Sequence, residues 1–291
     1  MTPATDSSEG PARATRPKIV QVLPRARQRP LVAHDWITER LSERDLAIVD
    51  AINTLRVLSG RQIQSLFFAT LPSGRSQVVS RARVLQRLVA LKVLAPLERR
   101  IGGAGRGSSG SVYALDSGGQ RILVQRQGAA GVPVRIRRPG TPTGRTLNHM
   151  LAVSQLFVDL IELGREHDVL IEYQTEPACW WPNGLGGKVK PDAYARLTKG
   201  PTVDHWWVEE DQATESLPTL LRKLEVYLDF LRRGQLGPDG VVPRVLVATV
   251  TDRRSEVVRH AISRLRSPAG DLVSVATNGF AARHLFEVLR E

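Results

Sequence analysis

Apolar residues at helical spacing mark the first ordered element that the sequence predicts. Ile48, Ile52 and Leu55 recur every three or four positions, the spacing that places side chains on one face of a helix. Asp45 follows Ser42 by three positions, which is the pattern of an N-cap with an acidic first turn. We therefore expect a helix that begins just after Ser42.

The same spacing continues in a short second helix and a longer third one. In the run RQIQSLFF, Ile63, Leu66 and Phe67 share one face. A Pro-Ser-Gly turn at 72–74 then leads into a third stretch, Ser73 to Leu94. Helix, short helix, turn and helix in this order is typical of a helix-turn-helix.

The third helix has two faces that favour different partners. Its apolar stripe, expected to face the core, consists of Val78, Ala82, Leu85 and Val89. The opposite face carries arginines and small hydroxyls, which suit phosphates and base edges. Candidate DNA contacts on this helix are Arg75, Ser76, Gln77, Ser80, Arg83 and Arg87. The alternative is an ordinary amphipathic helix with a solvated basic face.

Two β-rich runs, Val93 to Arg99 and Ser111 to Leu115, predict a hairpin after this helix. The glycine-rich loop between them predicts the wing of a winged helix. Arg99, Arg100 and Arg106 would there reach the DNA backbone or minor groove. The loop also contains GxGxxG spacing, but a strand-like run follows it and no Gly-Lys-Ser/Thr is present. We expect no nucleotide cofactor.

The second half of the chain changes to an α/β pattern. Residues 147 to 250 read as helix, three strands, helix and strand, and the remainder as helix, strand and helix. The fold class expected is a two-domain α+β or α/β protein. The predicted organisation is a basic tail (1–33), a winged helix-turn-helix (34–126), a basic linker (127–146) and an α/β domain (147–291).

Charge separates the two halves. The chain carries 41 Lys+Arg and 29 Asp+Glu, a formal net charge of +12. Residues 1–146 hold 24 basic and 9 acidic residues, a net +15, so the remaining residues carry −3. A basic module of this kind suits a polyanion, because each cation near a phosphate releases counterions. The partner expected is double-stranded DNA, bound by a single chain or by a homodimer.

Other features of the sequence exclude several classes of protein and of functional site. Cys179 is the only cysteine, which rules out an intrachain disulfide and fits a reducing cytoplasm. No apolar run of about 18 residues predicts a membrane span, and no secretion signal is recognisable. The sequence has no His-x-His pair to hold the metal of a rolling-circle relaxase, so we do not expect that chemistry. The paired tryptophans at 180–181 and 206–207 favour packing over stacking on bases.

Carboxylates gather on two of the predicted strands. Asp192 follows Pro191 on one, and the next carries Glu209, Glu210 and Asp211. Because side chains alternate along a strand, Glu209 and Asp211 share a face that Asp192 could meet. Such hard oxygens can hold Mg²⁺ beside a scissile phosphate. The alternative is a set of carboxylates on a solvated edge or paired with Arg222 and Lys223.

The order αβββαβ, with Pro-Asp on one strand and an acidic pair on the next, resembles the restriction-endonuclease-like PD-(D/E)xK core. The resemblance implies that Asp192 is the motif's Asp and Glu209 its (D/E), as metal ligands and catalytic residues. The motif's lysine position holds Asp211, which puts cleavage in doubt. Lys223 on the following helix is the candidate replacement, and Glu162 matches an additional acidic ligand.

From about Leu41 onward the chain is similar to the replication-relaxation family of plasmid and mobile-element proteins. The segments that carry this resemblance include LSERDLAIVDAI, SRARVLQRLVALKVL, NHMLAVSQLFVDL, KPDAYARL and WWVEEDQATESLPTLLRKLEVY. It implies DNA binding connected with replication or relaxation of plasmid DNA. Two hypotheses follow: a winged-helix DNA-binding protein whose second domain is a degenerate nuclease, or an active Mg²⁺-dependent endonuclease.

Overall fold

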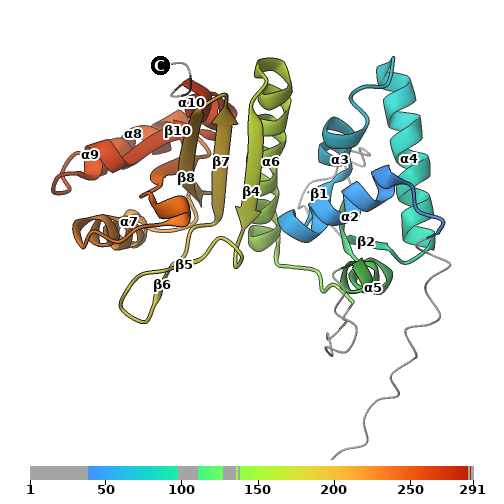
Figure 1. Cartoon of the computed structure of the whole chain (residues 1–291), viewed down its shortest axis with the longest axis horizontal. Helices are drawn as coiled ribbons and strands as arrows, with labels where there is room; N and C mark the ends of the chain where they lie inside the picture. Colours follow the sequence, from blue (N-terminus) through green and yellow to red (C-terminus); the bar gives the residue numbers. More distant parts are fainter. Residues whose placement is uncertain (1–38, 98–110, 127–135, 137, 288, 290–291) are drawn as a thin grey trace, which may run out of the picture. The chain divides into compact units, whose positions relative to one another are not determined.

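The computed structural model describes residues 39–97, 111–126, 136, 138–287 and 289. Short helices and a small sheet come first, and a larger α/β assembly follows (Figure 1). The first elements are α2 (Glu43–Leu55), β1 (Leu58–Ser59), α3 (Gly60–Phe67), α4 (Gly74–Ala90), β2 (Leu94–Leu97), β3 (Val112–Leu115) and α5 (Ser117–Arg126). The predicted order of helix, short helix, helix and two strands is thereby confirmed.

Local capping explains where the first helices begin. Ser42 and Asp45 form a reciprocal capping box at the start of α2, as the sequence predicts. Ser59 and Gln62 form another at the start of α3. In each, two backbone N–H groups that lack helical partners are satisfied by side chains three residues apart.

The buried face of α4 differs from the prediction. Leu85 and Leu88 are buried, but Val78 is 45% exposed and Ala82 is exposed as well. The predicted core stripe is therefore wrong at Val78 and Ala82, in the amino-terminal half of the helix.

Polar contacts explain why α4 is rotated about its axis relative to the predicted orientation. Gln77 and Arg81 occupy positions that turn toward α3, and both bond the side chain of Gln64 there. Gln77 Nε2 also donates to the carbonyl oxygens of Ala69 and Leu71, which satisfies the turn before α4.

The predicted hairpin is present, with one strand that the sequence did not predict. Strands β2 and β3 pair antiparallel, with Leu94 opposite Leu115 and Leu97 opposite Val112. The two-residue strand β1 adds to the other edge of β3 and gives the order β1-β3-β2. The loop between β2 and β3, with Arg99, Arg100 and Arg106, lies outside the described residues.

The second part contains a mixed five-stranded sheet in the order β10-β9-β8-β7-β4. Strands β8, β9 and β10 run parallel, whereas β7 is antiparallel to both β8 and β4. The elements are α6 (Gly144–His167), β4 (Leu170–Thr175), β5 (Trp181–Pro182), β6 (Lys188–Val189), β7 (Ala193–Lys199), β8 (Thr202–Asp211), α7 (Leu217–Arg232), β9 (Arg244–Thr249), α8 (Asp252–Ile262), α9 (Ala269–Leu272), β10 (Val273–Thr277) and α10 (Asn278–Glu287). This mixed α/β architecture confirms the predicted fold class, and the short β5–β6 hairpin is an addition.

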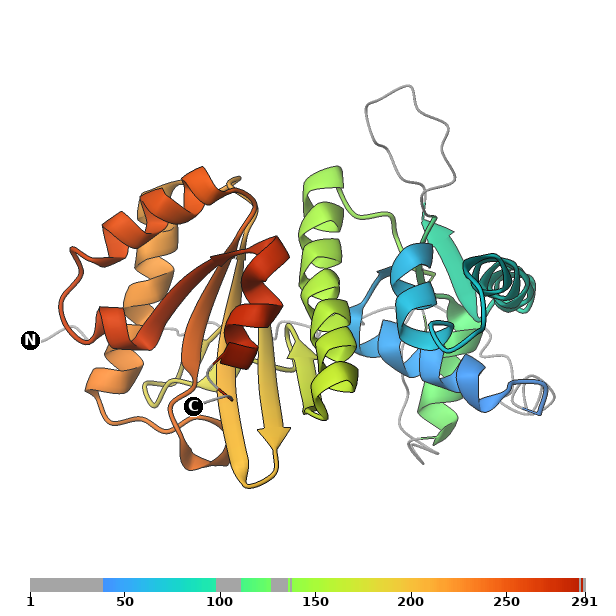
Figure 2. The same ribbon diagram turned by 90° about the horizontal axis from the view of Figure 1, so that it is seen from above.

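Helices cover both faces of this sheet (Figure 2). Residues of α6 and α10 share one hydrophobic cluster with β7, β8 and β9, while α7, α8 and α9 share a second cluster on the opposite face. Trp206 and Trp207 are completely buried, one on each face. Packing is therefore confirmed as the role of this tryptophan pair.

The long helix α6 also contacts the first part of the chain. Ser154 Oγ donates to the carbonyl oxygen of Val57 at 2.9 Å, and Gln62 Nε2 donates to that of Leu151 at 3.0 Å. The hydrophobic cluster that includes α6 continues into α2, α3 and α4. Among the described helices, none is long and apolar enough to cross a membrane.

Candidate nucleic-acid interface and acidic cluster

The exposed face of α4 combines arginines with small apolar side chains. Arg75, Val79, Ala82, Arg83 and Gln86 are exposed and follow one another at helical spacing. Val78 lies beside them and is exposed too. Because the helix is rotated from the predicted register, this face displays apolar groups that the sequence placed in the core.

Two of the predicted DNA contacts are free on this face. Arg75 and Arg83 make no ion pair or hydrogen bond with any described residue. No carboxylate therefore competes for their guanidinium groups within the described part of the chain. A free guanidinium can bond a phosphate or the edge of guanine in a bidentate way.

Arg87 has a different role from the one that its position in sequence suggests. Its Nη2 atom lies 2.7 Å from both carboxylate oxygens of Asp45 on α2, and Nη1 donates to the carbonyl oxygen of Arg40. The Asp45 side chain is 1% exposed, whereas that of Arg87 is 42% exposed. This pair ties α4 to α2, so Arg87 is a structural cation in this arrangement.

The remaining candidates on α4 are also engaged in the fold. Ser76 forms the capping box of α4 with Ser73, and Gln77 holds the preceding turn. Ser80 is half-buried. The structure thus leaves Arg75 and Arg83 as the accessible charged members of the predicted set on α4.

The carboxylates of the second part meet where β7 begins and β8 ends. The backbone N–H of Asp192 donates to the carbonyl oxygen of Val208, and Asp192 Oδ2 accepts from the N–H of Glu210. Glu209, Glu210 and Asp211 are all buried. Glu209 and Asp211 bond residues of α7 and α8, whereas Glu210 bonds Asn278 of α10. The predicted alternation of side chains along this strand is confirmed.

Glu209 is held by two groups from α7. The hydroxyl of Tyr227 donates to Glu209 Oε1, and Lys223 Nζ lies 3.5 Å from Oε2. Lys223 also contacts the exposed Glu215 at 3.3 Å. Burial, together with the nearby Asp192 carboxylate, raises the pKa of Glu209 to about 8. Lys223, the candidate replacement for the motif's lysine, thus lies on α7 beside Glu209.

The other carboxylates have partners of their own. Arg254 Nε donates to Asp211 Oδ2 at 2.6 Å, and the N–H of Ala213 donates to Oδ1. His149 Nε2 lies 3.2 Å from Asp192 Oδ1, and this hydrogen bond raises the pKa of His149. Burial raises the pKa of Glu210 to about 7.

This donor set does not fit a resident divalent cation. Both oxygens of Asp192, Glu209 and Asp211 already face a donor or cation of the protein. Among the described residues, no three of His, Cys, Asp or Glu are grouped as metal ligands. Proteins usually hold Mg²⁺ through one or two carboxylates together with waters, and here each of these carboxylates is already paired within the fold, so we derive no chemical step through a metal.

The acidic residue of α6 that approaches the cluster is not the predicted one. Glu162 is exposed. Asp159, one turn earlier, lines a small cavity of about 210 Å³ together with Glu210, Gln155 and Asn278. Burial raises the pKa of Asp159. Helical spacing alone allowed either residue, and only the packing of α6 on the sheet decides between them.

Four residues that bond the predicted site residues were not predicted as their partners from the sequence, namely Asp45, His149, Tyr227 and Arg254. Each meets its partner over a long stretch of chain: 42 residues separate Asp45 from Arg87, and 43 separate Asp211 from Arg254. No local pattern marks such contacts.

Comparison with known proteins agrees with the resemblance seen in the sequence. A family model described as replication-relaxation matches residues 49–245, which is more than half of the chain. None of the curated proteins compared with the chain matches it. The matched range runs from α2 through the acidic strand β8 and into β9. The chain therefore belongs to the replication-relaxation family.

Proposed function

We propose that this protein binds duplex DNA through a winged helix-turn-helix formed by α2, α3, α4 and the β2–β3 hairpin. Its family suggests a role in the replication or relaxation of plasmid or mobile-element DNA. The observation that carries the proposal is the exposed face of α4, on which Arg75 and Arg83 have no partner among the described residues.

The chemistry of this face suits the major groove. A guanidinium such as that of Arg83 bonds the O6 and N7 atoms of guanine, and an amide such as Gln86 bonds adenine. The methyl groups of Val78, Val79 and Ala82 would contact the methyl group of thymine. Mixed polar and apolar groups on one exposed helix face therefore favour reading of sequence over simple attraction to phosphate.

The second part of the chain has the features of a scaffold in this proposal. Its strand carboxylates contact Lys223, Arg254 and His149, and no three His, Cys, Asp or Glu residues of the described chain are grouped as metal ligands. Helix α6 bonds both α3 and the loop before β1, so the sheet domain would hold the DNA-binding helices in place.

A titration with salt tests the proposal. The logarithm of the binding constant should fall linearly with that of the salt concentration, with a slope of about −0.9 for each phosphate contacted. For the whole protein on a duplex of about 30 base pairs we expect a slope of about −4 or steeper. Fluorescence anisotropy of a labelled duplex measures it.

Arg253, exposed on α8 far along the sequence from α4, provides a control. The Arg253→Ala variant should keep the slope of the wild type, whereas the Arg75→Ala/Arg83→Ala variant should reduce it by about two. Absence of binding at low salt, or a slope near zero, would refute DNA binding.

A further inference from the structure

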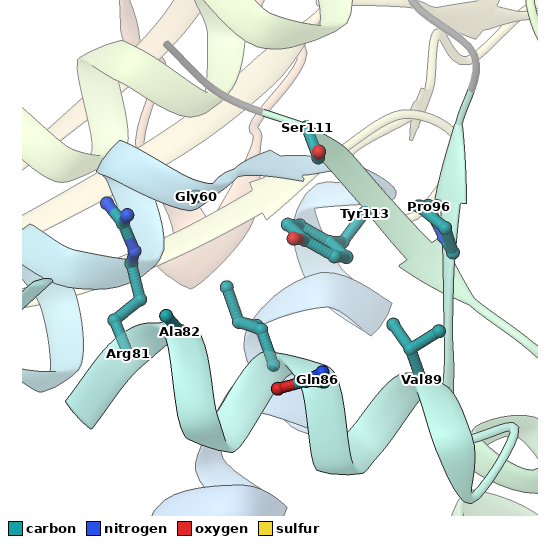
Figure 3. A pocket seen from close by; sticks show the side chains of 9 residues that line it. Gly60, Arg81, Ala82, Gln86, Val89, Pro96, Ser111 and Tyr113 are labelled. Carbon is teal, nitrogen blue, oxygen red and sulfur yellow. The ribbon is translucent and has the colours of Figure 1, made fainter. Parts of the chain in front are cut away.

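A groove of about 470 Å³ separates α4 from the strands of the hairpin (Figure 3). Arg81 and Gln86 line it from α4, Pro96 from β2 and Tyr113 from β3, with Ser111 just before β3. Gly60 at the start of α3 closes one end. The groove is thus built from four elements, α3, α4, β2 and β3, of the proposed DNA-binding unit.

The polar groups of the groove can all donate hydrogen bonds. The described residues that line it include no Asp or Glu. Arg81 Nη1 donates to Gln64 Oε1 at 2.8 Å, which fixes the guanidinium and leaves its other N–H groups available. The hydroxyl of Tyr113 has no hydrogen-bond partner among the described residues.

The rest of the lining is mainly apolar. The ring of Tyr113 lies in the middle of the groove, with Pro96 to one side and the side chain of Arg81 across from it (Figure 3). A Cβ atom on Gly60 would lie 3.8 Å from the Tyr113 ring and 3.9 Å from Arg81 Nε. A larger side chain at position 60 would therefore narrow the groove at this end.

We propose that this groove holds the sugar–phosphate backbone of the DNA strand beside the major groove that α4 occupies. Arg81, Ser111 and the Tyr113 hydroxyl bond the phosphate oxygens, and the sugar packs on the Tyr113 ring and Pro96. This inference rests on the proposed function and adds a binding subsite to it. It assigns DNA contacts to Arg81, Ser111 and Tyr113, which lie outside the exposed arginine pair.

The chemistry of the groove favours the sugar–phosphate backbone of DNA over a small apolar molecule as its ligand. The groove presents donors and a fixed cation, which match the two free oxygens of a phosphodiester. Contacts of this kind fix the register of a protein on duplex DNA without reading the bases.

The test compares Arg81→Gln and Tyr113→Phe with Arg83→Ala. Affinities are measured for a duplex selected from random sequence by the wild type, and for the same duplex with its sequence scrambled. Arg81→Gln should weaken binding roughly tenfold on both duplexes and make the salt slope about one less steep. Tyr113→Phe, which keeps the ring, should weaken both roughly threefold. Arg83→Ala should instead reduce the preference for the selected duplex.

A second measurement removes the phosphate charge from the DNA. Selected duplexes, each with a single methylphosphonate, should include one that binds the wild type roughly tenfold more weakly and Arg81→Gln no more weakly than the unmodified duplex. If the wild type binds no duplex, the proposed function itself fails. If the wild type binds but Arg81→Gln and Tyr113→Phe bind equally well, or lose only preference, the groove does not hold the backbone. Thermal melting of both variants confirms that they are folded.

Discussion

The Arg87→Ala variant is expected to lose about 2 to 3 kcal/mol of its free energy of unfolding. The substitution leaves the Asp45 carboxylate buried, with only the N–H and hydroxyl of Ser42 as donors. Removing one partner of a buried ion pair costs about 3 to 5 kcal/mol, and the 42% exposure of the Arg87 side chain reduces that figure. Urea unfolding, monitored by circular dichroism, measures the change.

A surface pair of similar length serves as the control. Arg126 Nη1 lies 2.7 Å from Asp50 Oδ1, but both side chains are more than 40% exposed. Arg126→Ala should therefore cost less than about 1 kcal/mol. Equal losses in the two variants would show that the buried Asp45 is not what makes the α2–α4 contact strong.

Stability should also fall as the pH rises from about 4.5 to about 8, because of Glu209. Burial and the Asp192 carboxylate raise the pKa of this group from its ordinary 4.5 to about 8 in the folded chain. Between these values the folded state binds more protons than the unfolded state, so the free energy of unfolding decreases with pH. One such group contributes up to about 1.4 kcal/mol per pH unit.

Variants that replace a carboxyl group with an uncharged amide distinguish the contribution of Glu209 to this pH dependence from those of its neighbours. Glu209→Gln should reduce the slope of stability against pH over this interval, because the amide does not titrate. Glu210, with a pKa of about 7, and His149, with a raised pKa, contribute slopes of the same sign and should remain. Glu215→Gln, which changes the exposed partner of the same Lys223, should follow the wild type. If Glu209→Gln retains the full slope, the assignment to Glu209 is wrong.

The elements that follow local rules could be predicted from the sequence. Capping pairs span three residues, so Ser42 with Asp45 marks the start of α2 directly. Alternation along a strand likewise places Glu209 and Glu210 on opposite faces of β8. Each inference needs only the geometry of one element.

The errors arise where a distant polar contact outweighs the local hydrophobic pattern. Val78 and Ala82 read as core positions, but Gln77 and Arg81 turn toward Gln64, which is 13 and 17 residues away. Spacing cannot reveal such a contact, because the partner lies on another helix. The rotation matters for function, since it exposes the apolar groups that accompany the arginines.

The acidic strand shows the same limit. The sequence places Asp192, Glu209 and Asp211 on neighbouring strands. The structure brings them together where β7 begins and β8 ends. Their cationic partners come from α6, α7 and α8, elements that spacing along the strands does not connect. Carboxylates of a type that can bind Mg²⁺ are thereby paired with side chains of the protein itself.

The central claim, that α4 reads DNA with its exposed face, is tested most directly by comparing Arg83→Ala with Arg87→Ala. These arginines lie one turn apart on one helix, but Arg87 is paired with Asp45 and Arg83 is free among the described residues. Affinity for one duplex is measured at a temperature at which both variants are folded. We predict that Arg83→Ala binds at least about tenfold more weakly at unchanged thermal stability, and Arg87→Ala within about threefold of the wild type. Binding by Arg83→Ala as tight as that of the wild type would contradict the claim.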